Sequence, residues 1–160
     1  MLNKIITYRE PVILGIHYNY CHNPSVTLIL NGEVHSFAEE ERFSRIKHAF
    51  DAFPVKALDF CMANADISLK EVTDIAISWD VTKYPDHIRR FNAEVIDRYG
   101  PLSEFSLKWL HSNDRFSQAI LETRLHQGIP ELAKLAIKPR INYVPHHLSH
   151  AASAFFMSGF

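Results

Sequence analysis

Two histidines one helical turn apart stand near the end of this 160-residue chain, within His146-His147-Leu148-Ser149-His150. In an α-helix, side chains four residues apart lie on one face, so His146 and His150 can bind a single divalent cation. His147 is rotated from His146 by about 100°, since a helix has about 3.6 residues per turn, and does not easily share that geometry. Neutral imidazoles are common metal ligands, so the spacing predicts a metal site. From the spacing alone, two surface histidines at a helix start are an equally good interpretation.

Two imidazoles leave a metal short of ligands, so carboxylates or water must complete the coordination shell. The pattern differs from the His-Glu-x-x-His motif of zinc proteases, because position 147 is His and Leu148 supplies no acid to act as a base.

A second candidate group is His22, in the polar segment Tyr20-Cys21-His22-Asn23-Pro24-Ser25. This segment joins two predicted strands at one end of a sheet, where ligand-binding loops often lie. A histidine there can act as a general base toward a hydroxyl, because its ordinary pKa is close to working pH. The alternative is a turn histidine followed by Asn-Pro, and the spacing alone favours that alternative.

A third candidate is the charged run Glu39-Glu40-Glu41-Arg42-Phe43-Ser44-Arg45-Ile46-Lys47-His48. Its basic residues Arg42, Arg45 and Lys47, with His48 beside them, can bind a phosphate or a carboxylate. From composition alone, a solvated turn or short helix whose Glu and Arg residues pair with one another is the better interpretation.

The elements that must position these residues follow from the apolar patterns. Short apolar runs predict strands at residues 12–16, 25–30, 33–38, 73–79 and 141–144. Asn31-Gly32 predicts a tight hairpin turn between the second and third strands, because both positions of such a turn need positive φ. Apolar residues three and four apart predict a helix over 54–65, and the alanine content favours another over 146–156.

Residues 84–138 are charged and mostly helical in pattern, and we interpret them as an insertion of two or three helices. The order of strands and helices predicts an α/β or mixed layer domain. Neither the Gly-x-Gly-x-x-Gly pattern of dinucleotide-binding folds nor a Walker phosphate loop is present in the sequence.

The composition fits a soluble globular domain, with 47% hydrophobic and 22% charged residues. The net charge of -1 gives no electrostatic reason to expect nucleic-acid or acidic-membrane binding. The first ten residues lack the apolar core of a signal peptide, and the apolar runs are too short to span a bilayer. The two cysteines, Cys21 and Cys61, are far apart and indicate no disulfide framework, so we expect a cytoplasmic protein.

Taken together and in this order, the segments resemble the O-carbamoyltransferase family of antibiotic and nodulation-factor biosynthesis. Ile13-Leu14-Gly15-Ile16 and the later His22-Asn23-Pro24-Ser25 are similar to its first strand and its His-Asp-x-Ser loop, and Asn31-Gly32 matches its Asp-Gly hairpin. Residues 39–48 are close to its Glu-Glu-Glu-Arg-Phe-[Ser/Thr]-Arg-x-Lys-His signature. Residues 146–154 are close to its His-His-Leu-[Ala/Ser]-His-Ala-Ala-Ser-Ala signature. The resemblance begins near Val12, and two long motifs together favour it over the alternatives above.

The resemblance implies the first half of an actin- and sugar-kinase-like (ribonuclease H-like) domain over residues 1–160, with a helical insertion at about 84–138. It also implies the chemistry of the full-length enzyme, in which a separate domain makes carbamoyl-adenylate from carbamoyl phosphate and ATP. The kinase-like domain then transfers the carbamoyl group to a hydroxyl of a small-molecule acceptor.

The resemblance further implies roles for single residues. His146 and His150 would be ligands of iron or zinc, and His22 would act as a base or orienting group near the acceptor hydroxyl. Lys47 would contact the anionic intermediate, with Arg42, Arg45 and His48 as further substrate-binding residues. Asn23 replaces the family's usual Asp beside His22, and an amide would orient that histidine more weakly.

The family's remaining nucleotide contacts and its adenylate-forming domain lie beyond the residues of this chain. We therefore expect a fragment that is inactive alone and pairs with the carboxy-terminal portion, a partner chain or a second copy. The alternative is a non-catalytic metal-binding or partner module. A plain α/β domain with incidental histidines is the third interpretation, which the two long motifs disfavour.

Overall fold

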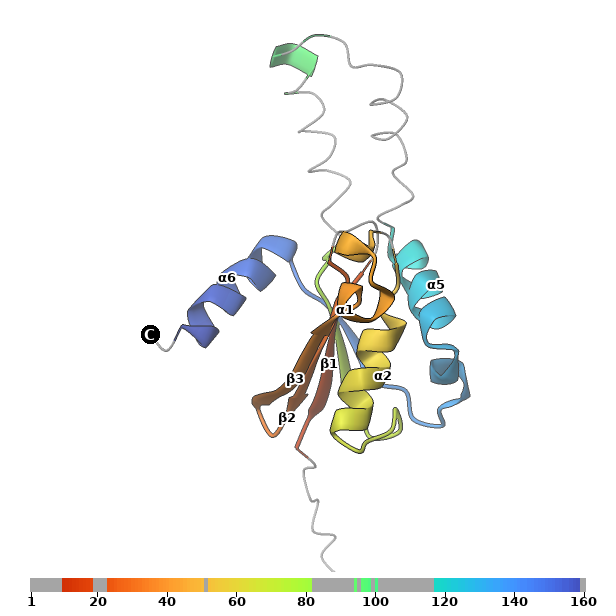
Figure 1. Ribbon diagram of the computed structural model, residues 1–160. Coiled ribbons are helices and arrows are strands. Elements are labelled where there is room, and N and C mark those ends of the chain that lie inside the picture. Colours follow the sequence, from red (N-terminus) through yellow and green to blue (C-terminus); the bar gives the residue numbers. More distant parts are fainter. Residues whose placement is uncertain are drawn as a thin grey trace, which may run out of the picture.

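A five-stranded mixed sheet forms the centre of the molecule, with the strand order β3-β2-β1-β4-β5 (Figure 1). The computed structural model describes residues 10–18, 23–50, 52–81, 94, 96–98, 100 and 117–158. The strands are β1 (Val12–His17), β2 (Ser25–Leu30), β3 (Glu33–Glu39), β4 (Asp74–Ile77) and β5 (Arg140–Tyr143). The predicted α/β domain is confirmed, although the predicted fourth strand over 73–79 is shorter than expected.

The strand directions bring four strand ends to one edge of the sheet. β1, β2 and β3 form an antiparallel meander, and β4 and β5 run parallel to β1. β3 therefore also runs in the direction of β1. The carboxyl ends of β1, β3, β4 and β5 consequently share an edge, which we call the carboxyl edge.

The hairpin between β2 and β3 follows from its two turn residues. Asn31 and Gly32 have φ values of 54° and 79°, as the predicted tight turn requires. Neither residue adopts such angles at much cost, because glycine lacks a Cβ and asparagine tolerates the left-handed region.

Helical segments surround the sheet. They are α1 (Glu41–Ser44), η1 (Lys47–Ala49), α2 (Val55–Asn64), α5 (Gln118–Gly128), η3 (Pro130–Lys134) and α6 (His146–Met157). The predicted helices over 54–65 and 146–156 are confirmed as α2 and α6. The charged run forms two short helical turns, α1 and η1, within the predicted loop or short helix.

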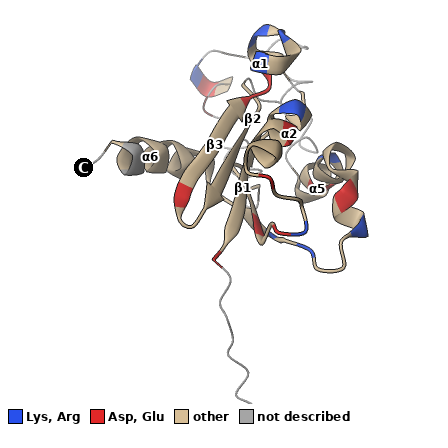
Figure 2. Ribbon diagram, turned by 60° about the horizontal axis from the view of Figure 1, so that its bottom comes forward, with Lys and Arg blue, Asp and Glu red and all other residues tan. Residues whose placement is uncertain are grey.

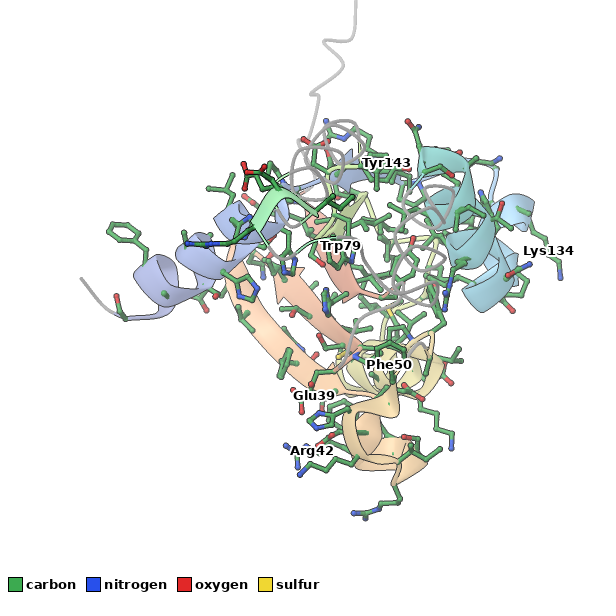
Figure 3. All side chains as sticks on the ribbon, turned by 90° about the horizontal axis from the view of Figure 1, so that it is seen from above. Glu39, Arg42, Phe50, Trp79, Lys134 and Tyr143 are labelled. Atoms are coloured by element: carbon green, nitrogen blue, oxygen red, sulfur yellow. The ribbon has the colours of Figure 1, made fainter. Side chains whose placement is uncertain are left out.

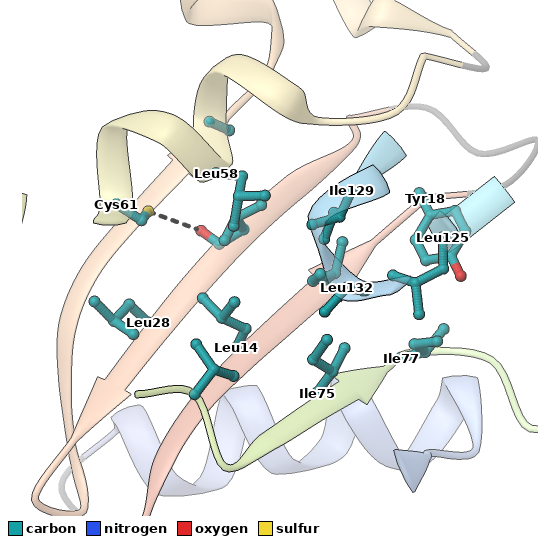
Figure 4. Close-up of a cluster of buried hydrophobic side chains, with 14 of the residues drawn as sticks. Leu14, Tyr18, Leu28, Leu58, Cys61, Ile75, Ile77, Leu125, Ile129 and Leu132 are labelled. Atoms are coloured by element: carbon teal, nitrogen blue, oxygen red, sulfur yellow. Dashed lines mark hydrogen bonds between the residues drawn. The ribbon is translucent and has the colours of Figure 1, made fainter. Parts of the chain in front are cut away.

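The hydrophobic core lies between one face of the sheet and α2, α5 and η3 (Figure 4). Because side chains alternate along a strand, every second residue of the central strands points to this face. These residues are at most 2% exposed: Leu14, Ile16, Val26, Leu28, Ile75 and Ile77. Leu58 and Cys61 of α2 lie one helical turn apart and pack against them.

α5 and η3 fall within the predicted insertion, yet they belong to this core. Leu121 and Leu125 of α5, four residues apart on one face, are 0% and 1% exposed. Ser117 begins α5 by accepting a hydrogen bond from the backbone N–H of Ile120, at 3.3 Å. The rest of the predicted insertion lies largely outside the described residues.

On the other face of the sheet, the side chains near the carboxyl edge are small or polar, and α6 lies on that side (Figures 1 and 4). α6 contains no Asp, Glu, Lys or Arg, so no part of this helix is blue or red in Figure 2. Within the described residues, no helix combines the length and apolar character needed to cross a bilayer.

Candidate functional site

The histidine pair of α6 converges as its spacing predicted. The Nε2 atoms of His146 and His150 are 3.1 Å apart. Two nitrogen ligands of one zinc ion, each at about 2.0–2.1 Å, lie about 2.8–3.4 Å apart for octahedral or tetrahedral angles. The pair therefore fits a shared cation. His147 is exposed, and its ring lies edge-on to that of His146, with the ring centroids 5.9 Å apart.

The protonation of His146 also suits a ligand. Its Nδ1 lies 3.4 Å from the carbonyl oxygen of Ser78, which can only accept a hydrogen bond. A hydrogen bond between these atoms requires a proton on Nδ1, and in the neutral imidazole this leaves a lone pair on Nε2, which faces His150. Without a cation, His150 can donate its Nε2 proton to that lone pair. With one, both nitrogens can act as ligands.

Two residues beyond the predicted site residues lie beside this pair. The indole of Trp79 stacks on the imidazole of His146 with ring centroids 4.3 Å apart and an interplanar angle of 4°. His17, at the end of β1, lies within hydrogen-bonding distance of the Ser78 hydroxyl through its Nδ1. Its ring centroid is 6.0 Å from that of His146. His17, Trp79, His146 and His150 thus form one aromatic cluster at the carboxyl edge.

A cleft of about 210 Å³ opens between the polar face of the sheet and α6. Its wall includes His17 and four side-chain hydroxyls, those of Ser25, Thr27, Ser78 and Ser149. The volume is below the roughly 300–1,000 Å³ of sites that enclose drug-sized ligands, so the cleft has room for one polar group of a larger molecule. The rest of the wall is apolar, so the cleft combines hydrogen-bonding hydroxyls with apolar surface.

The charged run after β3 is anchored by a buried glutamate. Glu40 is 5% exposed, and its Oε2 accepts the backbone N–H of Ala57 at 2.9 Å. This carboxylate satisfies one of the free N–H groups in the first turn of α2, where negative charge is favourable. Glu40 is therefore a structural residue, which composition alone did not distinguish from its neighbours.

The run is further held by Asn23, which precedes β2. The backbone N–H of Asn23 donates to the carbonyl of His48 at 2.8 Å, and its side-chain oxygen lies 3.2 Å from His48 Nδ1. The backbone N–H of His48 donates to Glu41 Oε2 at 2.7 Å. Arg45, His48 and Ala49 have φ values of 60°, 63° and 37°, so three non-glycine residues are held in the left-handed region.

The four predicted substrate-binding residues, Arg42, Arg45, Lys47 and His48, are all exposed. Arg42 makes ion pairs with Glu39 at 3.4 Å and with Glu41 at 3.8 Å, as the alternative interpretation of the run expected. Figure 3 views the carboxyl edge and shows Arg42 beside Glu39, with Trp79 on the same edge. The strand directions thus bring the basic run and the histidine pair to one edge of the sheet.

The predicted base, His22, lies outside the described residues. The described residues on either side of it in sequence, Tyr18 and Asn23, lie at the carboxyl edge, since β1 ends at His17 and β2 begins at Ser25. Among the residues that the structure describes, no group of three or more His, Cys, Asp or Glu side chains could hold a metal ion. A metal ion bound by His146 and His150 would therefore need further ligands from water, from a substrate or from residues outside the described ranges.

Residues 12–160 match the family described as "Carbamoyltransferase N-terminus". The chain belongs to this carbamoyltransferase family. The match begins at the first residue of β1 and includes both the basic run and α6, so the predicted site residues lie within the family's region.

Other members show how this region sits in longer chains. The chain is 33% identical to the uncharacterised protein sll1178 of Synechocystis sp., over 92% of this chain and 23% of that protein. It is 28% identical to the nodulation protein NolNO of Sinorhizobium fredii, over 92% of this chain and 19% of that protein. A Rhizobium etli protein, described as an uncharacterised 19.2 kDa protein in the syrM 5′ region, is 33% identical over 36% of this chain and 33% of its own length. The chain thus spans about a fifth to a quarter of its first two relatives.

Proposed function

We propose that this carbamoyltransferase region belongs to an O-carbamoyltransferase, which moves a carbamoyl group from carbamoyl-adenylate to a hydroxyl of a small molecule. The observation that carries the proposal is the convergence of His146 and His150 on one point beside a hydroxyl-lined cleft. In the reaction, the acceptor oxygen forms a bond to the carbamoyl carbon. The bond from that carbon to the adenylate phosphate breaks, AMP leaves, and the hydroxyl proton passes to a base.

His146 and His150 would hold a divalent metal, either iron or zinc. Such an ion, when bound, supplies positive charge that stabilises the negative charge developing on the adenylate phosphate. The two imidazoles would hold the ion at one side of the site. The hydrogen bond to the Ser78 carbonyl would keep the Nε2 lone pair of His146 directed at the ion.

The basic run supplies the other part of an anion site. Arg42, Arg45, Lys47 and His48 are exposed on the carboxyl edge, where cationic side chains can bind the carbamoyl-adenylate. His22 is the proposed base for the acceptor hydroxyl, and the cleft is the proposed entry for the part of the acceptor that carries this hydroxyl.

The strand order supports the finer fold assignment. Three antiparallel strands followed by two strands parallel to the first, with helices on both sides, agree with the first half of an actin- or sugar-kinase-like domain. In the longer protein, a separate adenylate-forming domain would consume ATP and carbamoyl phosphate. The carboxy-terminal portion, a partner chain or a second copy would complete the site, in the cytoplasm.

Calorimetric titration with Zn²⁺, and with Fe²⁺ under anaerobic conditions, tests the metal site. We expect wild-type chain and His147→Ala to bind one ion weakly, because two histidines do not complete a coordination shell, and His150→Ala to lose at least about 10-fold in affinity, because a ligand is removed. Equal uptake by wild type and His150→Ala would remove the assignment. A carbamoyl-transfer assay with carbamoyl phosphate and ATP should give no turnover by this chain alone.

The second candidate is a non-catalytic metal-binding or partner module, which would use the same His146–His150 pair without any transfer chemistry. The two candidates differ in one measurement. Mixing this chain with the remainder of its longer parent should restore carbamoyl transfer if the region is catalytic, and the His150→Ala mixture should not. Metal uptake without any restored transfer would favour the module.

A further inference from the structure

We propose that Trp79 is a positioning residue for the metal-binding pair, holding the His146 imidazole so that its Nε2 faces His150. The inference depends on the metal site proposed above. It concerns a residue 67 positions earlier in the chain, which no motif of the sequence singles out.

The His146 ring is held on an edge and on a face by two consecutive residues. The backbone carbonyl of Ser78 accepts a hydrogen bond from Nδ1 at 3.4 Å, which restrains the position of that edge of the ring. Trp79 lies parallel to the ring at 4.3 Å, which fixes the face. Rotation of the imidazole about its Cβ–Cγ bond would break both contacts, so the lone pair of Nε2 keeps its direction.

Trp79 can serve as a support because the indole is itself anchored to the core. Its Nε1–H donates to the backbone carbonyl of Tyr18 at 2.9 Å. Tyr18 is fully buried, and its hydroxyl donates to the carbonyl of Leu121 in α5 at 2.8 Å. A continuous series of contacts therefore connects α5, Tyr18, Trp79 and His146.

The helix alone does not provide this constraint. His150 is exposed, and Leu148 and Phe155 of α6 are 56% and 59% exposed, so α6 gives the imidazoles little packing of its own. An imidazole without a fixed direction must lose rotational freedom on binding a metal, which weakens affinity. Contacts behind a metal-ligating histidine typically change metal affinity by about 10–100-fold.

Three variants test the ring stacking of Trp79 on His146 and the hydrogen bond from Trp79 Nε1 to Tyr18. Trp79→Leu removes the aromatic face, and we expect about 10-fold weaker Zn²⁺ binding in competition with a chromophoric chelator. Trp79→Phe keeps an aromatic face but loses the Nε1–H that anchors the indole to Tyr18, so its affinity should lie between those of Trp79→Leu and the wild type. Phe60→Leu is the matched control, since Phe60 also contacts another ring, at 5.5 Å, but on α2. It should bind as wild type.

A second measurement does not depend on the folding of a Trp79 variant. In a Trp109→Phe chain, Trp79 is the single tryptophan, and Co²⁺ bound beside the stack should quench its emission with the affinity that Co²⁺ itself shows in the same competition assay. Binding without quenching, or wild-type Zn²⁺ affinity in a folded Trp79→Leu, would overturn the positioning role while leaving the metal site intact. Absence of binding by the wild-type chain would instead overturn the metal site, and with it this inference.

Discussion

Gly128 ends α5 at a point where the chain has no room for a side chain. A Cβ at this position would lie inside contact distance of the Phe53 ring, including its Cγ atom. Alanine normally favours a helix over glycine by about 0.5–1 kcal/mol. Overpacking against a ring that is itself held against Tyr18, with centroids 4.9 Å apart, costs about 1–3 kcal/mol and should prevail.

We therefore predict that Gly128→Ala lowers the free energy of unfolding by about 1–2 kcal/mol, measured by urea denaturation. The partner variant is Phe53→Leu, whose smaller side chain leaves space for the new methyl group. In that background, Gly128→Ala should be neutral or slightly stabilising. The same loss in both backgrounds would show that the Phe53 ring is not the cause.

At the level of single site residues, the sequence was informative wherever the chemistry was local. The spacing of His146 and His150 predicted their convergence, because a helix sets that distance by itself. The exposure of Arg42 and its pairing with Glu39 were also expected from composition. Trp79 and His17 were missed, since their importance comes only from contact with a helix that lies far away in sequence.

Among the elements, the pairing of β4 with β5 is stabilised by one carboxylate, which accepts hydrogen bonds from side chains of the other strand. Asp74 of β4 is 6% exposed and accepts hydrogen bonds from two nitrogens of Arg140, at 2.9 and 3.1 Å, and from Asn142 at 3.2 Å. The hydrogen bonds from Arg140 hold the pKa of Asp74 below its ordinary value of 3.8, although burial acts in the opposite direction. The ionised carboxylate therefore stabilises the fold.

We predict that Asp74→Asn lowers the free energy of unfolding by about 1–2 kcal/mol at pH 7, because hydrogen bonds to a charged group are lost. A lowered folded pKa gives stability that is present above pH 3.8 and is lost as the pH falls through the folded pKa. The difference between variant and wild type should therefore shrink below that range. Denaturation curves at several pH values measure it, with the exposed Asp59→Asn as control. A difference that stays constant with pH would contradict the ionic role.

The elements themselves could be predicted to a different extent in each half of the chain. The β2–β3 hairpin and α2 follow from local signals, the Asn31-Gly32 turn and the apolar spacing of residues 54–65. The pairing of β4 with β5 joins Asp74 to Arg140, and no local pattern specifies such a distant partner. For the same reason, the apolar face of α5 could not be assigned to the core before the sheet was known.

For the molecule as a whole, stability at high pH depends on buried tyrosines. Burial is the largest cause that raises the pKa of Tyr18 above its ordinary value of 10.0, and the pKa of Tyr143 rises to about 12, mainly through burial and also through its hydrogen bond to Glu122. A raised folded pKa gives stability that is complete below pH 10 and is lost at higher pH, because the unfolded chain ionises first.

We predict that the melting temperature of wild-type chain falls as the pH rises above about 10, and that Tyr18→Phe reduces this alkaline loss. At pH 7 the same variant should be about 1 kcal/mol less stable, since the hydrogen bond to Leu121 is removed. Tyr143→Phe, at a half-buried position, should reduce the alkaline loss less. Identical alkaline melting profiles for all three proteins would contradict the role of burial.

The neighbouring placement of β4 and β5 has a consequence for how this region can diverge. The chain leaves the sheet after Ile77 and returns to it at Arg140. Val81, shortly after the exit, and Leu121, before the return, are both buried in the core. Ser78 and Trp79, which contact His146, both precede position 81, and His146 itself follows β5. The two contacts with His146 are therefore made by residues at the ends of neighbouring parallel strands, so relatives that keep the pairing of β4 with β5 keep the means to orient this imidazole.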